Sequence, residues 1–377
     1  MKNSVFTYKL IETKEGFYNL STEWNDLLCR SMIANPFLTW NWMYNWWDTY
    51  GDRISDVSLC IITVIEDERL VGILPGFIQV KSNTHTFFFL GSQFESPDYL
   101  EMIREKQKSD VIFIENSLNY LLSKRRIDVI AFNSVLKDSL FLRSLNQFVS
   151  NNRLRSYTRF NKVCPFIDIN GSWDDFVEGL SKNMRYNLRR RTRKMQNEFQ
   201  AEFQIVNSYD KVEQAIDEIF LLHQLWFTSR KKDDSFLPDL RKDFHKKIGQ
   251  SLFNQDILRI FQLKVNDKII AVLYCYEYAN QLFFYQSGAD PDWSKYSIGM
   301  VLLGYVIQYA HTKRLSRFDF LRGGEDYKFN WTNQSQLMGA VYIGVSHKGK
   351  IIVLKRTTYI QLKKAIKTLL RMLGIHF

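Results

Sequence analysis

Residues 297–331 read SIGMVLLGYVIQYAHTKRLSRFDFLRGGEDYKFNW, and they predict a helix, then a buried strand, then a loop. The apolar residues after Ser297 recur at helical spacing. We expect Ser297 to cap the helix and Gly299 to let a ligand approach the main chain. A helix that begins in this way offers unpaired N–H groups and a positive dipole end to an anion such as a pyrophosphate. The predicted anion site uses the backbone N–H groups of Ser297, Ile298, Gly299 and Met300.

The second half of this stretch places ionisable residues at the end of a strand. Phe318, Phe320 and Leu321 predict a buried strand that runs into the loop at Gly323-Gly324. Polar groups at a strand end beside an anion-binding helix are often functional. Asp319 lies between two Phe residues, so we expect it to be buried with a structural partner.

The run from Asp319 to Trp331 resembles the GNAT-like acyltransferases of the CelD-like type, which are relatives of the FemAB peptidyltransferases. Members typically show an Asp-Phe pair, a Gly, an acidic pair, Tyr-Lys and a closing Trp in this order. Gly324 stands where relatives often carry Asp. The resemblance extends back to about Arg185, and more weakly to residues 35–37.

This resemblance implies a fold and an activity. The fold is α/β with mixed sheets, in a tandem of two GNAT-like units. The activity is direct transfer of an acyl group from acetyl-CoA or another acyl-CoA to an amine or hydroxyl, without a metal. The implied acceptor is a small molecule or a glycan or lipid intermediate of envelope or exopolysaccharide assembly. Two alternatives are a FemAB-like transferase that uses charged tRNA, and a non-catalytic basic module at a membrane or nucleic acid.

The resemblance also assigns catalytic residues to the loop. Glu325 is expected in a half-buried position, where a carboxylate has a raised pKa and acts as a base. Lys328 would stabilise negative charge or orient an acidic substrate. Tyr327 completes the set, although packing is its alternative role. For Glu325 and Lys328 the alternative is a structural ion pair.

Further candidates lie upstream. In a GNAT-like fold the strand at 283–288 would run beside the pantetheine arm, which makes Tyr285 and Gln286 candidate cofactor-binding residues. His223 lies in an apolar helical stretch just before Trp226, as a His does in relatives. An imidazole that faces a cleft would suit a general base, whereas a lone His on an apolar helix is otherwise a core residue. Trp226 is a candidate for substrate binding.

A basic run precedes these residues. Arg185 and Arg189 lie four apart on the helix predicted at 183–199 and form a basic stripe, which we assign to substrate binding. Such a stripe can also be a solvated face, or grip nucleic-acid phosphates without reading bases. Because no zinc spacing or RNP-like signature accompanies it, we do not expect a dedicated nucleic-acid binder.

Composition limits the classes of partner and compartment. The chain has 377 residues, a formal net charge of +11 and a pI near 9.3, which favours an anionic partner. Its four cysteines are far apart and form no C-x-x-C pair, as expected for reduced thiols in the cytosol. No apolar run reaches the roughly 18 residues of a spanning helix, and no secretory signal is evident. We therefore expect a cytoplasmic protein, with membrane association only through its tail.

The pattern of elements repeats once. Strands at 57–65, 70–80 and 86–90 read as a meander, and so do strands at 257–265, 269–278 and 281–288, with a turn at Asn266-Asp267. Two strands at 153–160 and 163–169 close the first half, and Ser172 opens the next helix with a capping box to Asp175. We predict one unit over residues 1–170, a second over 171–347, and a basic tail over 348–377. The helix at 39–50 carries Trp residues on both faces. We assign them to core packing rather than to a ligand groove.

The tail predicts an amphipathic helix. It carries eight Lys or Arg residues and no acid. Such a helix either docks on its own domain or lies on an anionic membrane surface. We expect docking, because terminal amphipathic helices usually bury their apolar stripe. The stripe consists of Leu362, Ile366, Leu369, Leu370 and Leu373.

Overall fold

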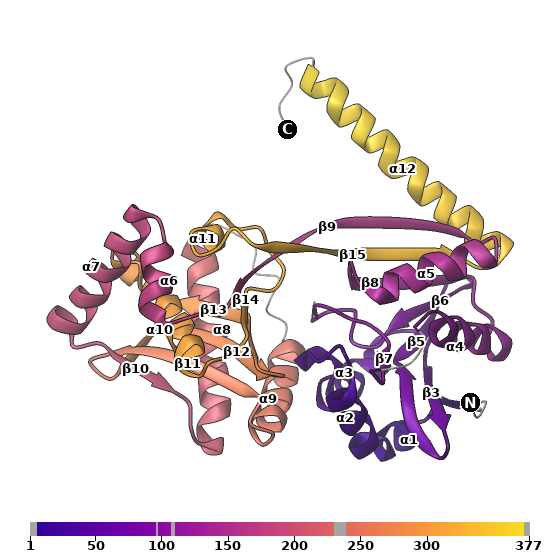
Figure 1. Ribbon diagram of the computed structural model, residues 1–377, viewed down its shortest axis with the longest axis horizontal. Coiled ribbons are helices and arrows are strands. Elements are labelled where there is room, and N and C mark those ends of the chain that lie inside the picture. The colour runs from indigo at the N-terminus through magenta and orange to yellow at the C-terminus, as the bar shows by residue number, and fades with distance from the viewer. Residues whose placement is uncertain (1–5, 96, 107–109, 230–238, 373–377) are drawn as a thin grey trace. The chain divides into compact units, whose positions relative to one another are not determined.

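The computed structural model describes residues 6–95, 97–106, 110–229 and 239–372, which divide into two compact units (Figure 1). Unit 1 comprises residues 1–33, 50–161 and 337–377, and unit 2 comprises residues 34–49 and 162–336. Both units contain helices and β-sheet, which confirms the predicted mixed α/β class. The chain passes between the units at 33/34, at 49/50 near the end of α3 (Trp40–Tyr50), at 161/162 in β9 and at 336/337 in β15, whereas the sequence placed a boundary near Asn170-Gly171.

Unit 1 is built on two sets of strands. Strands β1, β3, β4 and β7 form one antiparallel sheet, and β2, β5, β6, β8 and β15 follow one another in a second. The elements are β1 (Phe6–Ile11), α1 (Lys14–Asn19), α2 (Ser21–Arg30), β2 (Val57–Leu59), β3 (Ile61–Glu66), β4 (Arg69–Leu74), β5 (Gly76–Lys81), β6 (Thr84–Phe89), β7 (Ile103–Arg104), α4 (Asp110–Lys124), β8 (Val129–Leu136), α5 (Leu140–Asn151), the first half of β9 (Arg155–Asp168), β15 (Ser335–Gly344) and α12 (His347–Met372).

Two predicted strands of unit 1 are each broken in two. Cys60 separates β2 from β3, and Pro75 separates β4 from β5. Pro75 lacks an N–H and cannot donate to a strand ladder, so pairing is interrupted there. The Cys60 N–H donates to Gly76 O at 2.9 Å, which holds the two breaks together. One long hairpin therefore supplies strands to both sheets.

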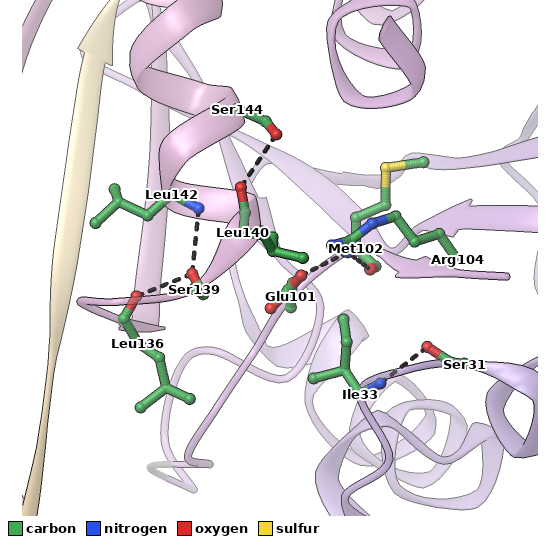
Figure 2. A network of polar contacts seen from close by, with 10 residues as sticks. All are labelled: Ser31, Ile33, Glu101, Met102, Arg104, Leu136, Ser139, Leu140, Leu142 and Ser144. Atoms are coloured by element: carbon green, nitrogen blue, oxygen red, sulfur yellow. Dashed lines mark hydrogen bonds and ion pairs between the residues drawn. The ribbon is translucent and has the colours of Figure 1, made fainter. Parts of the chain in front are cut away.

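A buried ion pair lies beside β7 (Figure 2). Arg104 is 3% exposed, and its Nη1 lies 2.5 Å from Glu101 Oε1 and donates to Met102 O at 3.3 Å. Nearby, Ser139 caps α5: its hydroxyl accepts from Leu142 N at 3.1 Å. These bonds supply partners to polar groups that would otherwise destabilise the interior of unit 1.

Unit 2 has one sheet in the order β10-β11-β12-β13-β14-β9, antiparallel except for the parallel pair β13–β14. Its elements are α3 (Trp40–Tyr50), α6 (Trp173–Gly179), α7 (Lys182–Phe199), β10 (Glu202–Ile205), α8 (Val212–Ser229), α9 (Asp239–Phe253), β11 (Leu258–Val265), β12 (Lys268–Tyr278), β13 (Gln281–Ala289), α10 (Ile298–Thr312), β14 (Arg317–Asp319) and α11 (Asp326–Phe329), with the second half of β9.

The two faces of this sheet differ in composition. Leu273 and Phe284 belong to the core that α7 and α10 share with the sheet. On the opposite face, Tyr274 and Tyr285 lie 5.6 Å apart between ring centroids. There Trp42 of α3 packs edge-on against Tyr285 at 5.7 Å and is 0% exposed. The predicted core role of this Trp-rich helix is confirmed for Trp42.

Most local predictions hold, and one strand does not. Ser172 forms the predicted capping box with Asp175. Asn266 and Asp267 have φ values of 47° and 61°, as the turn of a two-residue hairpin requires. The sequence predicted two strands at 153–160 and 163–169, whereas β9 runs unbroken from Arg155 to Asp168. The reason is that no turn-forming Gly or Pro separates the two predicted strands.

The strand orders of the two units end in the same pattern, a parallel pair followed by an antiparallel partner. In unit 1, β6 pairs with β8 in parallel and β8 pairs with β15 antiparallel. In unit 2, β13 pairs with β14 in parallel and β14 pairs with β9 antiparallel. Residues 338–344 of β15, which pair with β8, thus follow most of unit 2 in sequence. Residues 166–168 of β9, which pair with β14, follow directly after the half of β9 that belongs to unit 1.

The tail forms the predicted helix, but its apolar stripe is not buried. Leu362 and Ile366 are 56% and 54% exposed, so the expected docking of this stripe is wrong for these residues. Leu373 lies outside the described residues. Within the described ranges, no helix is both long and apolar enough to cross a membrane.

Asp128 ties the start of α12 to β8, and we expect a pH-dependent effect of Asp128→Asn. Burial favours the neutral carboxyl, but hydrogen bonds from Ser346 Oγ at 2.5 Å and His85 N at 3.0 Å outweigh it and lower the pKa below its ordinary 3.8. A lowered pKa stabilises the fold above the unfolded pKa, and this stabilisation is lost as pH falls through the folded pKa.

The substitution should therefore lower the free energy of unfolding by about 1–3 kcal/mol at neutral pH. The difference should narrow below about pH 4, as measured by urea denaturation. Asp138→Asn is the matched control in the same unit, because Asp138 is exposed. A loss that does not change between neutral and acid pH would contradict the assignment.

Candidate functional site

A cavity of about 440 Å³ lies in unit 2 where β13 and β14 diverge. The two strands pair in parallel only from Gln281–Arg317 to Phe283–Asp319. Beyond Phe283, β13 continues alone on this edge to Ala289, and its residues Phe284, Ser287 and Gly288 line the cavity. The parting strands therefore leave a slot with one free strand edge.

The turn after β14 is held by its own side chains. Asp319 is 1% exposed, and its Oδ1 accepts from Leu321 N at 2.7 Å. Leu321 has a φ of 55°, a left-handed conformation that Asp319 stabilises from two residues away. The structural role expected for Asp319 is confirmed. This turn directs the chain away from β13 toward α11.

The start of α10 forms one wall of the cavity. Ser297, Gly299 and Met300 all line it. Ser297 itself adopts a left-handed conformation with φ of 54° and makes no side-chain cap, so the predicted capping by its hydroxyl is wrong. The physical reason is the preceding turn of 3-10 helix at Pro291–Tyr296, which ends at Ser297 and fixes its backbone.

The anion site predicted from the backbone has two open donors. Met300 N donates to Ser297 O at 3.0 Å and is used internally. The N–H groups of Ile298 and Gly299 donate to no other residue in the described part of the chain. A Cβ built on Gly299 would meet nothing within 4 Å, so this glycine borders open space. Ser297 N is also used, since it donates to Ser294 O at 3.0 Å. Of the two unpaired donors, Gly299 lines the cavity, whereas Ile298 is 1% exposed and does not.

Tyr327 also faces this cavity. It lies on α11 and is 44% exposed. Desolvation and, second, the charge of Glu325 raise its pKa. The phenol is therefore protonated at neutral pH and able to donate a hydrogen bond or a proton.

Lys328 and Glu325 are placed differently. Lys328 is 4% exposed, and its Nζ donates to Phe320 O at 3.2 Å and Arg322 O at 3.1 Å. The third partner is Glu325 Oε2 at 3.0 Å, which accounts for all three ammonium donors. The Glu325 side chain is 56% exposed rather than half-buried as expected. This geometry matches the structural alternative, a clamp on the loop.

Two predicted residues lie away from the cavity. His223 on α8 is 4% exposed and does not line it. Its backbone N would lie 2.8 Å from a Cβ on Gly288, which shows how closely α8 packs on β13. Tyr285 points to the opposite face of the sheet, 5.4 Å from the His245 ring. Gln286 Oε1 accepts from Ser287 N at 3.0 Å and so covers part of the free edge of β13.

The basic residues of α7 line a groove of about 1110 Å³ next to Lys295 and Tyr296. Arg185 and Arg189 share Glu178, at 2.8 Å and 2.5 Å, so their charge is partly neutralised. Arg191 lines both this groove and the cavity and makes no ion pair with any described residue. Of the three residues predicted to bind substrate, Trp226 lines the cavity, whereas Arg185 and Arg189 line the groove.

Sequence reasoning missed Arg191, Ser294 and Asn330, all of which line the cavity. Arg191 is part of the basic run, but the sequence did not single it out, because a helical stripe alone does not show which side chain faces a cavity. Arg191 lies seven residues after Met184, which also lines the cavity. This spacing places the two side chains on the same face of the helix, and it was the signal that the sequence offered.

We expect Lys328→Met to destabilise the folded loop, and not only to lower activity. The substitution keeps the stem but leaves Phe320 O and Arg322 O without their donor, so the free energy of unfolding should fall by about 1–3 kcal/mol. Glu325→Gln is the matched control, since an exposed ion pair contributes little. Thermal and urea unfolding measure both variants. Parent-like unfolding of Lys328→Met would contradict the clamp.

Comparisons with known proteins agree with this geometry. Residues 182–329, from the first residue of α7 to the last of α11, match the family described as an acetyltransferase (GNAT) domain. No curated protein sequence matches the chain.

Solved structures are similar in fold. FemX aligns over 91% of this chain and 98% of its own, with 8% identity and a TM-score of 0.62. A conserved protein of unknown function from Bacteroides thetaiotaomicron VPI-5482 aligns over 90% and 100%, with 10% identity and a TM-score of 0.54. A tandem GNAT protein from the clavulanic acid biosynthesis pathway aligns over 90% and 99%, with 8% identity and a TM-score of 0.47. Residues 182–329 are therefore similar to the acetyltransferase (GNAT) domain family, in a chain whose fold is similar to that of FemX.

Proposed function

We propose that this chain is an acyl-CoA-dependent acyltransferase that transfers the acyl group directly to an amine or hydroxyl. The observation that carries the proposal is the unpaired N–H of Gly299, which lines the cavity between β13 and β14 at the start of α10. A helix N-terminus with free N–H groups suits a pyrophosphate. The adjoining free edge of β13 suits the amides of a pantetheine arm, which can pair with it as an added strand.

The cavity fits such a substrate in charge and in lining. Arg191 supplies a positive charge at the side shared with the basic groove. Leu273, Phe284 and Leu303 supply an apolar wall. When bound, acyl-CoA supplies an activated thioester. The chain supplies the anion site, the strand edge and a proton donor.

Tyr327 is the residue we propose for proton transfer at this site. Tyr327 lines the cavity and carries its phenolic proton at neutral pH, so it can donate that proton to a leaving thiolate. No cysteine lines the cavity in the described part of the chain. Burial raises the pKa of Cys275 well above its usual value. Direct transfer is thus favoured over a covalent thioester on the protein.

The acceptor class and a second candidate function also belong to this proposal. We propose an amine- or hydroxyl-bearing sugar or lipid intermediate of envelope or exopolysaccharide assembly, as the sequence resemblance implies. The second candidate is transfer from charged tRNA, which the large basic groove beside the cavity favours. Calorimetry separates the donors: saturable binding of acetyl-CoA supports the first, and binding of charged tRNA alone supports the second.

Gly299→Ala tests the anion site without disturbing the fold. The new methyl meets no atom within 4 Å, and Ala is favoured over Gly in a helix by roughly 0.5–1 kcal/mol. We expect unchanged or higher thermal stability. Because the methyl occupies the space next to the open donors, we also expect acetyl-CoA affinity to fall by about tenfold or more, measured by calorimetry.

Gly179→Ala is the matched control. Gly179 ends α6, and its added Cβ also meets nothing within 4 Å, but it lies outside the cavity. It should bind acetyl-CoA as the parent does. Equal affinity in Gly299→Ala and the parent would refute the proposed anion site.

Tyr327→Phe tests the proton donor. We expect kcat to fall by about 10²-fold or more with a smaller change in KM for acetyl-CoA, because the ring that lines the cavity is kept. Release of free thiol from acetyl-CoA across a panel of amino sugars measures both constants. Tyr209→Phe, at a similarly exposed Tyr, is the control and should leave kcat unchanged. A parent-like kcat in Tyr327→Phe would remove Tyr327 from the mechanism.

A further inference from the structure

Among the described residues of helix α12 (Figure 1), contacts with the rest of unit 1 are found near its start. Lys348 Nζ donates to Asn83 O at 2.9 Å, and Val353 is 1% exposed. The Arg356 guanidinium lies 3.6 Å from the centre of the Tyr342 ring. The helix then continues to Met372. The face that carries Val353 is therefore the docking face of α12.

A different face of α12 is apolar and exposed. Ile351, Leu354, Leu362 and Ile366 are 54%, 43%, 56% and 54% exposed. At 3.6 residues per turn these four positions fall within an arc of about 120°, on the side away from Val353. Large apolar side chains that recur along one exposed helix face are unusual in a protein without a partner there. We call this set the apolar stripe.

The charges of this segment select the kind of partner. Residues 347–377 contain eight Lys or Arg and no Asp or Glu. Lys355 and Lys363 are exposed and lie within or beside the apolar stripe. A second copy of α12 would bring two uniformly basic helices together, which like-charge repulsion opposes. Nucleic acid would use the cations but would leave the apolar stripe in water.

We propose that α12 binds the surface of an anionic lipid membrane through the apolar stripe. An interfacial helix buries its apolar side among acyl chains while basic residues contact lipid headgroups. Lys355 can extend its ammonium to the headgroups while its stem stays among the apolar side chains. The inference does not depend on the acyltransferase proposal, since it uses only residues of α12.

The test is flotation of the intact chain with vesicles. One set is phosphatidylcholine with roughly one third phosphatidylglycerol, and the other is phosphatidylcholine alone. We expect the chain to float with the anionic vesicles only, and less at about 1 M salt, where screening reaches about 3 Å. The double variant Leu362→Glu/Ile366→Glu should reduce partitioning by about tenfold or more. Its melting temperature should match that of the parent, because both side chains are exposed.

Leu221→Glu is the matched control, because Leu221 on α8 is 55% exposed. It should float as the parent does. Failure of the intact chain to float, or undiminished flotation of the double variant, would overturn the proposal. So would a dimer in sedimentation analysis that the double variant abolishes, or a lower melting temperature of the double variant without vesicle binding, because these outcomes assign the stripe to a second copy or to the chain itself.

Discussion

The hydrogen bond from Leu321 N to Asp319 Oδ1, at 2.7 Å, shapes the candidate site more than any other contact. It holds Leu321 in a left-handed conformation just after β14, and so stops β14 from following β13 any further. The slot, the free edge of β13 and the position of Tyr327 all depend on this turn. Lys328 stabilises the same turn, because its Nζ donates to Phe320 O and Arg322 O. Lys328, which the sequence resemblance assigned to catalysis, thus supports the site together with Asp319.

The sequence predicted those features that depend on local chemistry. Asn266-Asp267 formed its turn because these residues tolerate positive φ. Ser172 capped its helix because Asp175 lies three residues ahead. The helix at 298–312 was also predicted correctly from its apolar spacing. In each case the deciding partner lies within a few residues of the chain.

The features that were missed depend on contacts that are remote in sequence. Ser297 makes no cap because the turn before it sets its backbone, so the usual preference of Ser at that position does not operate. Tyr285 was assigned to the cofactor, but it is the extra residue at a register shift, since Tyr274 pairs with Gln286 and Cys275 pairs with Phe284. Its ring lies on the aromatic face, while Phe284 and Ser287 line the cavity. A shift of one residue moves a side chain across the sheet, and a pattern of apolar and polar letters in a strand buried on both faces does not fix that register.

The late position of β15 in the sequence has a consequence for how the protein is made. The edge of β8 that β15 occupies is left open until residues 335–344 have been synthesised. During translation unit 1 therefore leaves the ribosome with an unpaired strand edge, while residues 162–336 of unit 2 are still to come. An open edge of this kind is a site for wrong pairing between chains. Fast closure by β15 at the end of synthesis, or protection by a chaperone before it, is thus part of what this topology requires of the cell.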